Sequence, residues 1–136
     1  ERSLLHPDGS IELFNFDDAD FRLLLGQIIV HAADISIPVH KNFTVARDWC
    51  IRIALEFKRQ AENEKRLGLT VAPFMDGLET EYEISKKQIC FYNFMVLPVF
   101  KMISKFLPKA AHLEQSCLEN TERYREVVNS AVHHRK

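Results

Sequence analysis

The chain has 136 residues, of which 46% are apolar and 27% charged, and its net charge is −1. This length is enough for one domain with a buried core, and the near-neutral charge excludes the basic field that favours nucleic acid. The sequence therefore predicts no nucleic-acid partner, and function must be sought in a local site.

Three cysteines, Cys50, Cys90 and Cys117, are odd in number and widely spaced. This pattern predicts reduced thiols in an intracellular protein rather than a disulfide framework. No CxxC or CxxH pair occurs, which argues against a zinc site built from them. The apolar runs are shorter than the ~20 residues of a membrane span. Because the chain begins at Glu1 without a Met, we expect a fragment of a longer protein.

The sequence predicts a loop with a short extended piece over residues 1–16. It predicts a first helix over about residues 17–35. Its apolar residues recur at the spacing of a buried helix face: Phe21, Leu24, Leu25, Ile28, Ile29 and Ala32. Pro38 ends this helix and, as the following residue, pushes Ile37 out of helical space.

A second helix is predicted to begin at Asn42 or Thr44 and to end at a left-handed Gly68. Its apolar face consists of Ala46, Trp49, Cys50, Ile53, Phe57 and Ala61. Residues 69–83 then indicate a long ordered loop, of a length that is often functional.

A third helix is predicted from about Ile84, with a kink at Pro98, and a last helix from Lys109 to about His133. The sequence contains no strand pairs, repeats or low-complexity segments. The predicted fold class is therefore all-α, a compact multi-helix array around one core.

Asp34 falls in the last turn of the first helix, where the negative end of the helix dipole disfavours a carboxylate. The spacing leaves two interpretations open: a metal-binding or catalytic carboxylate, or a turn residue bonded to a connector amide or to Lys41. His31, one turn earlier, is either a core histidine or a ligand.

Gln88 precedes Phe91 by three residues, so the two side chains share one side of a helix. An amide can hydrogen-bond the edge of a nucleobase while an aromatic ring stacks on its face. The alternative is a surface glutamine beside a core phenylalanine.

Several motifs together resemble class I cyclic nucleotide phosphodiesterases over roughly residues 17–128. They are His31-Ala32-Ala33-Asp34-Ile35-Ser36, Trp49, Glu56-Phe57-x-Arg59-Gln60, Glu64-x-x-Leu67-Gly68, Pro73-x-x-Asp76 and Gln88-x-x-Phe91-x-x-Phe94-x-x-x-Pro98. The resemblance implies that residues 1–136 are the C-terminal portion of a single all-helical catalytic domain.

The resemblance also implies hydrolysis of a 3',5'-cyclic nucleotide, cAMP or cGMP, to the 5'-nucleotide at two divalent ions, zinc and magnesium or manganese. Asp34 would ligate the tightly held metal, and His31 would lie near it. Gln88 would hydrogen-bond the purine, and Phe91 and Ile53 would clamp it.

The family's upstream HNxxH and HDxxH motifs do not occur here. We therefore expect most metal ligands to lie outside this chain and the chain alone to be inactive. Ile37 stands where many relatives have an asparagine that can touch the base, so the preference for cAMP or cGMP stays open.

The first helix is apolar over more than half of its circumference. We expect either the missing N-terminal part of the domain or a second copy in a homodimer to cover it. The expected location is the cytoplasm, or the cytosolic face of a membrane through absent regions. The alternative function is a catalytically inactive helical module that binds a nucleotide or a partner helix beside Phe91 and Phe94.

Overall fold

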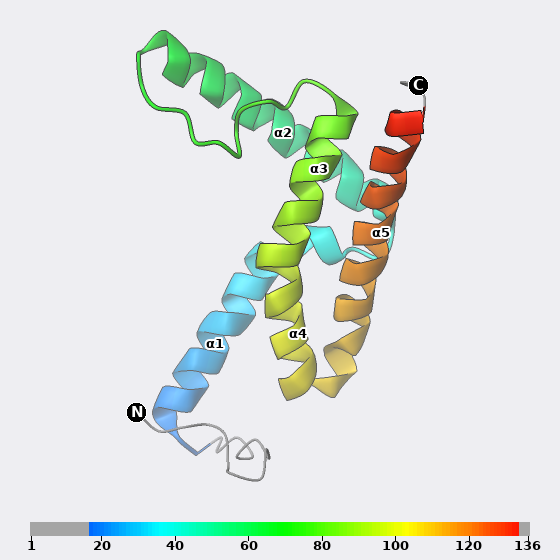
Figure 1. Cartoon of the computed structure of the whole chain (residues 1–136). Helices are drawn as coiled ribbons and strands as arrows, with labels where there is room; N and C mark the ends of the chain where they lie inside the picture. Colours follow the sequence, from blue (N-terminus) through cyan, green and yellow to red (C-terminus); the bar gives the residue numbers. More distant parts are fainter. Residues whose placement is uncertain (1–16, 134–136) are drawn as a thin grey trace, which may run out of the picture.

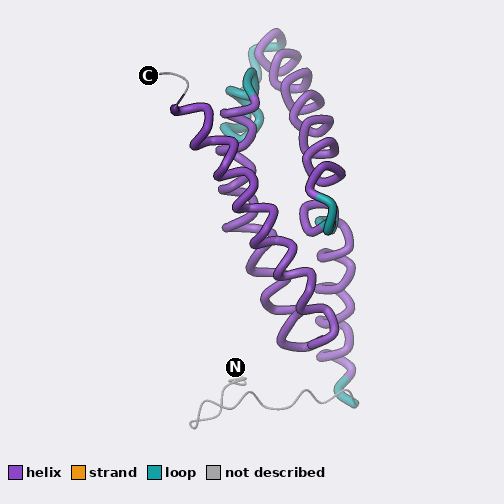
Figure 2. Tube along the Cα trace, turned by 90° about the vertical axis from the view of Figure 1, so that its right-hand side faces the viewer, coloured by secondary structure: helices purple, strands orange, loops and turns teal. Residues whose placement is uncertain are grey.

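The computed structural model describes residues 17–133, which form helices joined by short connectors and one longer loop. In chain order the elements are α1 (Ala19–Asp34), η1 (Ile37–Val39), α2 (Phe43–Arg66), α3 (Glu81–Phe91), η2 (Tyr92–Val96), α4 (Leu97–Phe106), η3 (Pro108–Ala110) and α5 (Ala111–His133). No strand occurs in this part of the chain (Figure 2). The all-α prediction is confirmed.

The core lies between α5 and a long rod in which α3, η2 and α4 follow one another (Figure 1). The rod buries Tyr92, Val96 and Phe100, and α5 buries Cys117 and Tyr124 against them. The two tyrosine rings meet edge to face, with centroids 5.6 Å apart. Helix α1 contacts α4, whereas the far end of α2 projects away from α5 (Figure 1).

The first two helices begin and end where the sequence predicts. The Asp18 side chain accepts hydrogen bonds from the first turn of α1, and the Asn42 side chain caps α2 in the same way. Gly68 has a φ of 71°, and the Leu69 amide donates to the Glu64 carbonyl at 2.9 Å. These two features form the left-handed helix end that the glycine indicates.

Helix α3 begins at Glu81, three residues before the predicted Ile84. The hydroxyl of Thr80 accepts from the Glu83 amide while the Glu83 carboxylate accepts from the Thr80 amide, which is a capping box. The loop is therefore shorter than predicted. The Lys87 ammonium holds it by donating to the Pro73 carbonyl at 2.8 Å.

Of two backbone predictions around prolines, the one for Ile37 needs correction. Ile37 is the first residue of the 3₁₀ turn η1, because Pro38 at its second position costs no hydrogen bond there. Before Pro98 the rod contains the π-helical turn η2, in which the Leu97 amide donates to the Tyr92 carbonyl. This wider turn directly precedes the proline, and the kink at Pro98 stays a prediction.

The predicted apolar face of α1 is confirmed in part: Ala32 is buried and Phe21, Leu25 and Ile28 are half-buried, whereas Leu24 and Ile29 are 50% and 43% exposed. Ala32 is the one fully buried residue of this helix. Leu23, Leu24 and Val30 are 63%, 50% and 71% exposed. The reason is that α4 is the main helix packed on α1, so most of its apolar surface has no neighbour within residues 17–133.

The rod from Glu81 to Phe106 is long and apolar enough, by length and composition alone, to cross a membrane. The apolar runs of the sequence did not indicate this. Core helices meet the same criterion, and here the rod buries Phe100 and Ile103 against the helical core. One helix that meets this criterion is weak evidence for a membrane span, and 22% of its apolar window is buried.

Candidate functional site

Asp34 is the last residue of α1, and its side chain is exposed. The helix ends at Ile35, whose amide donates to the His31 carbonyl at 3.2 Å. Within the described residues the Asp34 carboxylate has neither a hydrogen bond to a connector amide nor an ion pair with Lys41. The contacts of Asp34 therefore do not support its interpretation as a turn residue bonded to the connector or to Lys41.

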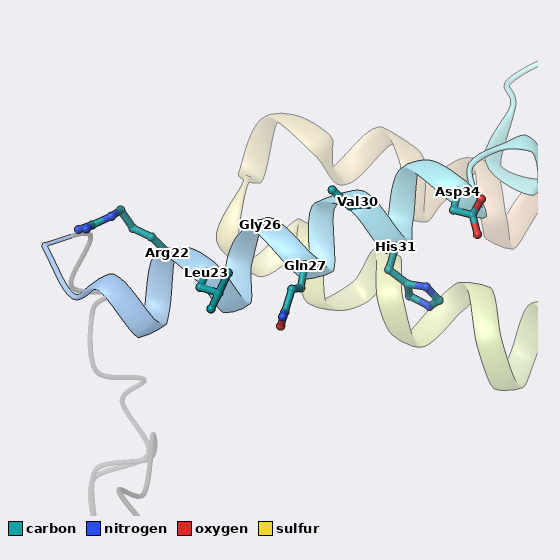
Figure 3. Close-up of a pocket in the computed structure, with 7 residues that line it drawn as sticks. All are labelled: Arg22, Leu23, Gly26, Gln27, Val30, His31 and Asp34. Carbon is teal, nitrogen blue, oxygen red and sulfur yellow. The ribbon is translucent and has the colours of Figure 1, made fainter.

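His31 and Asp34 lie one turn apart along an open hollow on the surface of α1 (Figure 3). The hollow is lined by Arg22, Leu23, Gly26, Gln27, Val30, His31 and Asp34. All seven residues belong to one helix, so the hollow has a floor but no opposing wall from the rest of the described chain.

A zinc-type ion needs three or four protein ligands. Among residues 17–133, no three His, Cys, Asp or Glu side chains gather closely enough to hold a metal ion. Asp34 and His31 can supply at most part of such a ligand set. The described residues by themselves therefore do not fit a resident metal.

The four predicted base-binding residues come from three elements. Gln88 and Phe91 lie on α3 and are half-buried, and Phe91 packs against the core. Ile53 is on α2 and 42% exposed, and Ile37 is half-buried in η1. Helix α2 contacts both η1 and α3, so these elements adjoin one another.

A second hollow is lined by residues of α2, α3 and α5. It is lined by Phe43, Thr44, Glu81, Tyr82, Arg123, Glu126, Val127, Ser130 and Ala131. Neither this hollow nor the one on α1 includes Gln88, Phe91, Ile53 or Ile37. The base-binding assignment thus remains a prediction.

Two buried polar residues that sequence reasoning did not single out hold the connector after Asp34. The Tyr92 hydroxyl and the Asn120 side-chain amide both donate to the Pro38 carbonyl, each at 2.8 Å. Asn120 also donates to the His40 carbonyl at 3.0 Å. A signal was present, because Asn120 interrupts the apolar stripe of the last helix, and a buried amide needs partners.

Burial also perturbs the ionisable groups of the core. It raises the pKa of the Cys50 thiol and of the Cys117 thiol to about 11, since the thiolate loses its hydration. Burial likewise raises the pKa of the Tyr92 and Tyr124 phenols. These groups are neutral at ordinary pH and serve packing and hydrogen bonding rather than acid–base chemistry.

A family model described as 3'5'-cyclic nucleotide phosphodiesterase matches residues 3–117, which is most of the chain. The chain belongs to this phosphodiesterase family. Membership confirms the resemblance carried by the sequence motifs.

Curated phosphodiesterases match over most of this chain. The human "High affinity cGMP-specific 3',5'-cyclic phosphodiesterase 9A" is 31% identical over 118 residues, which are 86% of this chain and 19% of that protein. The Dictyostelium discoideum "3',5'-cyclic-AMP phosphodiesterase 4" is 34% identical over 115 residues, 85% of this chain and 11% of that protein. The chain thus spans less than a fifth of the length of these relatives.

A solved phosphodiesterase has the same fold. The phosphodiesterase domain of a rhodopsin phosphodiesterase from Salpingoeca rosetta matches with a TM-score of 0.80 and 29% identity, over 86% of this chain and 35% of that one. A second crystal structure, of the phosphodiesterase domain of the RhoPDE fusion protein from the same organism, gives a TM-score of 0.83 over 38% of its chain. The helical arrangement is therefore that of one part of a larger phosphodiesterase domain.

Proposed function

We propose that this chain forms the C-terminal part of a catalytic domain that hydrolyses 3',5'-cyclic nucleotides to 5'-nucleotides. The observation that carries the proposal is the family match over residues 3–117, together with the same fold in a solved phosphodiesterase domain. The named relatives include a cGMP-specific and a cAMP phosphodiesterase, so the proposed substrate class is the cyclic nucleotide and not one base.

In this proposal Asp34 is one ligand of a metal site, and His31 lies beside that site. The exposure of both side chains on the same hollow supports the pairing. Two divalent ions, zinc and magnesium or manganese, would supply an activated water and neutralise charge on the phosphate. The other ligands would come from outside residues 17–133, since this part of the chain has too few.

The base would be held by residues of η1, α2 and α3. Gln88 would donate to or accept from the purine edge, because a side-chain amide can do both. Phe91 would stack on one face of the base and Ile53 would contact the other. Ile37 lies on η1 at the rim, where its aliphatic side chain offers packing but no hydrogen bond.

The exposed apolar residues of α1 support a second part of the proposal. Because this chain corresponds to 35% of the matched domain from S. rosetta, we propose that the rest of the catalytic domain covers α1. A homodimer of this chain is the competing occupant. In either case the 136-residue chain alone lacks a complete site, and we expect it to show no hydrolysis.

The test is Asp34→Ala in the complete protein that carries this chain. Losing a metal ligand removes several kcal/mol of transition-state stabilisation, so kcat/KM should fall by about 100-fold or more. Asp48→Ala, which removes another exposed carboxylate on α2, is the matched control and should keep full activity. Intact activity of Asp34→Ala means that the metal role is wrong.

Gln88→Ala separates the base pocket from the metal site. It should weaken cyclic nucleotide binding by about tenfold, in line with one or two lost hydrogen bonds, and leave the bound metal content unchanged. Metal content is measured by elemental analysis of the purified protein. A loss of metal with unchanged nucleotide affinity contradicts the assignment of Gln88.

A further inference from the structure

The connector between α1 and α2 is held by hydrogen bonds from distant parts of the chain. The Pro38 carbonyl accepts two of them, from the Tyr92 hydroxyl at the start of η2 and from the Asn120 side chain on α5. The same amide donates to the His40 carbonyl. We call Tyr92 and Asn120 the connector clamp.

Both donors of the connector clamp are inside the protein. Tyr92 is 1% exposed and Asn120 is 3% exposed. A buried polar group that loses its partner pays a desolvation penalty, so these donors fix where the connector can lie. Val39, 3% exposed, adds an apolar anchor in the core next to the clamped carbonyl.

The clamped segment carries the residues to which the proposed function gives roles. Ile37 directly precedes Pro38, and Asp34 ends α1 three residues before Ile37. By contrast, α1 itself is packed mainly against α4, and its apolar face is largely exposed. The connector clamp is therefore the main buried polar link between the C-terminal end of α1 and the core.

We propose that Tyr92 and Asn120 are positioning residues that set the place of Ile37, and through it the end of α1, for cyclic nucleotide binding. This inference rests on the proposed function and adds to it two residues that need not touch the substrate. They act through the Pro38 and His40 carbonyls, so their loss should loosen one rim of the base pocket.

A second buried tyrosine provides a matched control. Tyr124 is 2% exposed and its ring contacts the Tyr92 ring, but within the described residues its hydroxyl makes no hydrogen bond to the connector. Tyr92→Phe removes a hydroxyl that holds the connector, whereas Tyr124→Phe removes one that lies beside the Cys50 thiol. On α5, Thr121→Val is the control for Asn120→Ala, because the Thr121 hydroxyl donates only within its own helix, to the Cys117 carbonyl.

The experiment measures KM and kcat for cAMP and cGMP in the complete protein. Tyr92→Phe should raise KM by roughly three- to tenfold, the effect of one net hydrogen bond, and Asn120→Ala by more. Tyr124→Phe and Thr121→Val should keep the KM of the unmodified protein. Hydrogen–deuterium exchange of the amides of residues 37–42 should become faster in Tyr92→Phe and stay unchanged in Tyr124→Phe.

A purely structural role predicts a different result. If the clamp only adds stability, Tyr92→Phe lowers kcat per total protein through partial unfolding while KM stays the same, and this outcome overturns the inference. Equal exchange of residues 37–42 in Tyr92→Phe and Tyr124→Phe also overturns it. If the unmodified complete protein hydrolyses neither nucleotide, the proposed function fails instead, and the exchange measurement still decides whether the clamp holds the connector.

Discussion

Helix α1 and the helical rod of α3, η2 and α4 both carry periodic apolar residues, but they differ in how far these residues are buried. The rod buries Val96 and Phe100 to 0% and 2% exposure against α5, although its Phe94 is 78% exposed. In α1, Leu24 and Ile29 of the predicted face remain 50% and 43% exposed. The difference shows that a periodic apolar face tells how a helix can be buried, whereas its neighbours decide whether it is.

The comparison also explains how the site is divided. The rod and α5 form a packed support, and the connector clamp ties the end of α1 to it. Asp34 and His31 stand on the uncovered helix. The proposed ligand Asp34 and the neighbouring His31 therefore lie where this part of the fold is least complete, which agrees with a site that needs further segments.

The largest effect expected from this contrast is on stability. Phe100→Ala should lower the free energy of unfolding by about 3–5 kcal/mol, because it leaves a cavity in the core. Leu23→Ala, at an exposed position, should change it by less than about 0.5 kcal/mol in the 136-residue chain. Urea unfolding followed by circular dichroism measures both. A large loss for Leu23→Ala in the complete protein, but not in the chain, indicates that α1 is covered there.

The three cysteines also differ between buried and exposed positions. The pKa of the Cys50 and Cys117 thiols is raised from 9.0 to about 11, so their thiolate fraction near neutral pH is about 100-fold lower than for an ordinary thiol. Cys90 is exposed. A disulfide reagent should therefore modify Cys90 quickly and the other two only after unfolding. Cys90→Ser should abolish the fast phase, and its persistence contradicts the buried assignment.

These thiols also set an alkaline limit to stability. The unfolded chain ionises them near pH 9, and the folded chain only near pH 11. The contribution of these two thiols to folding stability is therefore fully present below pH 9 and is lost as the pH rises toward 11. Cys117→Ala should make the fall less steep than in the unmodified protein, as measured by the urea midpoint at each pH.

We expect the 136-residue chain to self-associate through the exposed apolar residues of α1. Leu23→Glu combined with Val30→Lys should weaken association of the 136-residue chain by roughly tenfold, since it interrupts an exposed apolar face. Leu118→Glu changes a residue on α5 that is 43% exposed and serves as the control. Sedimentation velocity over a range of concentrations measures the effect. Equal weakening by the control would place the contact elsewhere.

The smallest expected effect is on the N-terminal cap of α3, where the rod begins. Thr80→Ala removes the hydroxyl of the capping box and should cost about 1 kcal/mol of stability. Thr44→Ala is the control, because the cap of α2 is supplied by the Asn42 side chain and not by Thr44. The urea midpoint should fall for Thr80→Ala alone.

Local sequence signals predicted the helices well where their end signals are strong. Asn42 and Gly68 bound α2 as expected. The acidic residues around Glu81 predict a loop and so a later start of α3, whereas the Thr80-x-x-Glu83 spacing is a capping signal. The start of α3 is therefore encoded locally, in the capping box.

The burial of α1 and the connector clamp were beyond local rules. Leu24 and Ile29 have the spacing of core residues, yet their burial depends on segments that the pattern does not contain. The partners of Pro38 lie 54 and 82 residues further along the chain. The roles of Asp34 and Gln88 are predicted by the resemblance of motifs, because spacing alone leaves each residue with a structural alternative.

The connector clamp joins residues that are 54 and 82 positions apart in the sequence, and this separation affects the order of folding. During synthesis the Pro38 carbonyl emerges long before Asn120, and its two donors arrive only when the rod and α5 have been made. Contacts between residues so distant in the chain form slowly, because a large loop must close first. We expect α2 and the rod to acquire their helical structure early. The connector, with the residues proposed to meet the nucleotide, should be among the last segments to reach its final place.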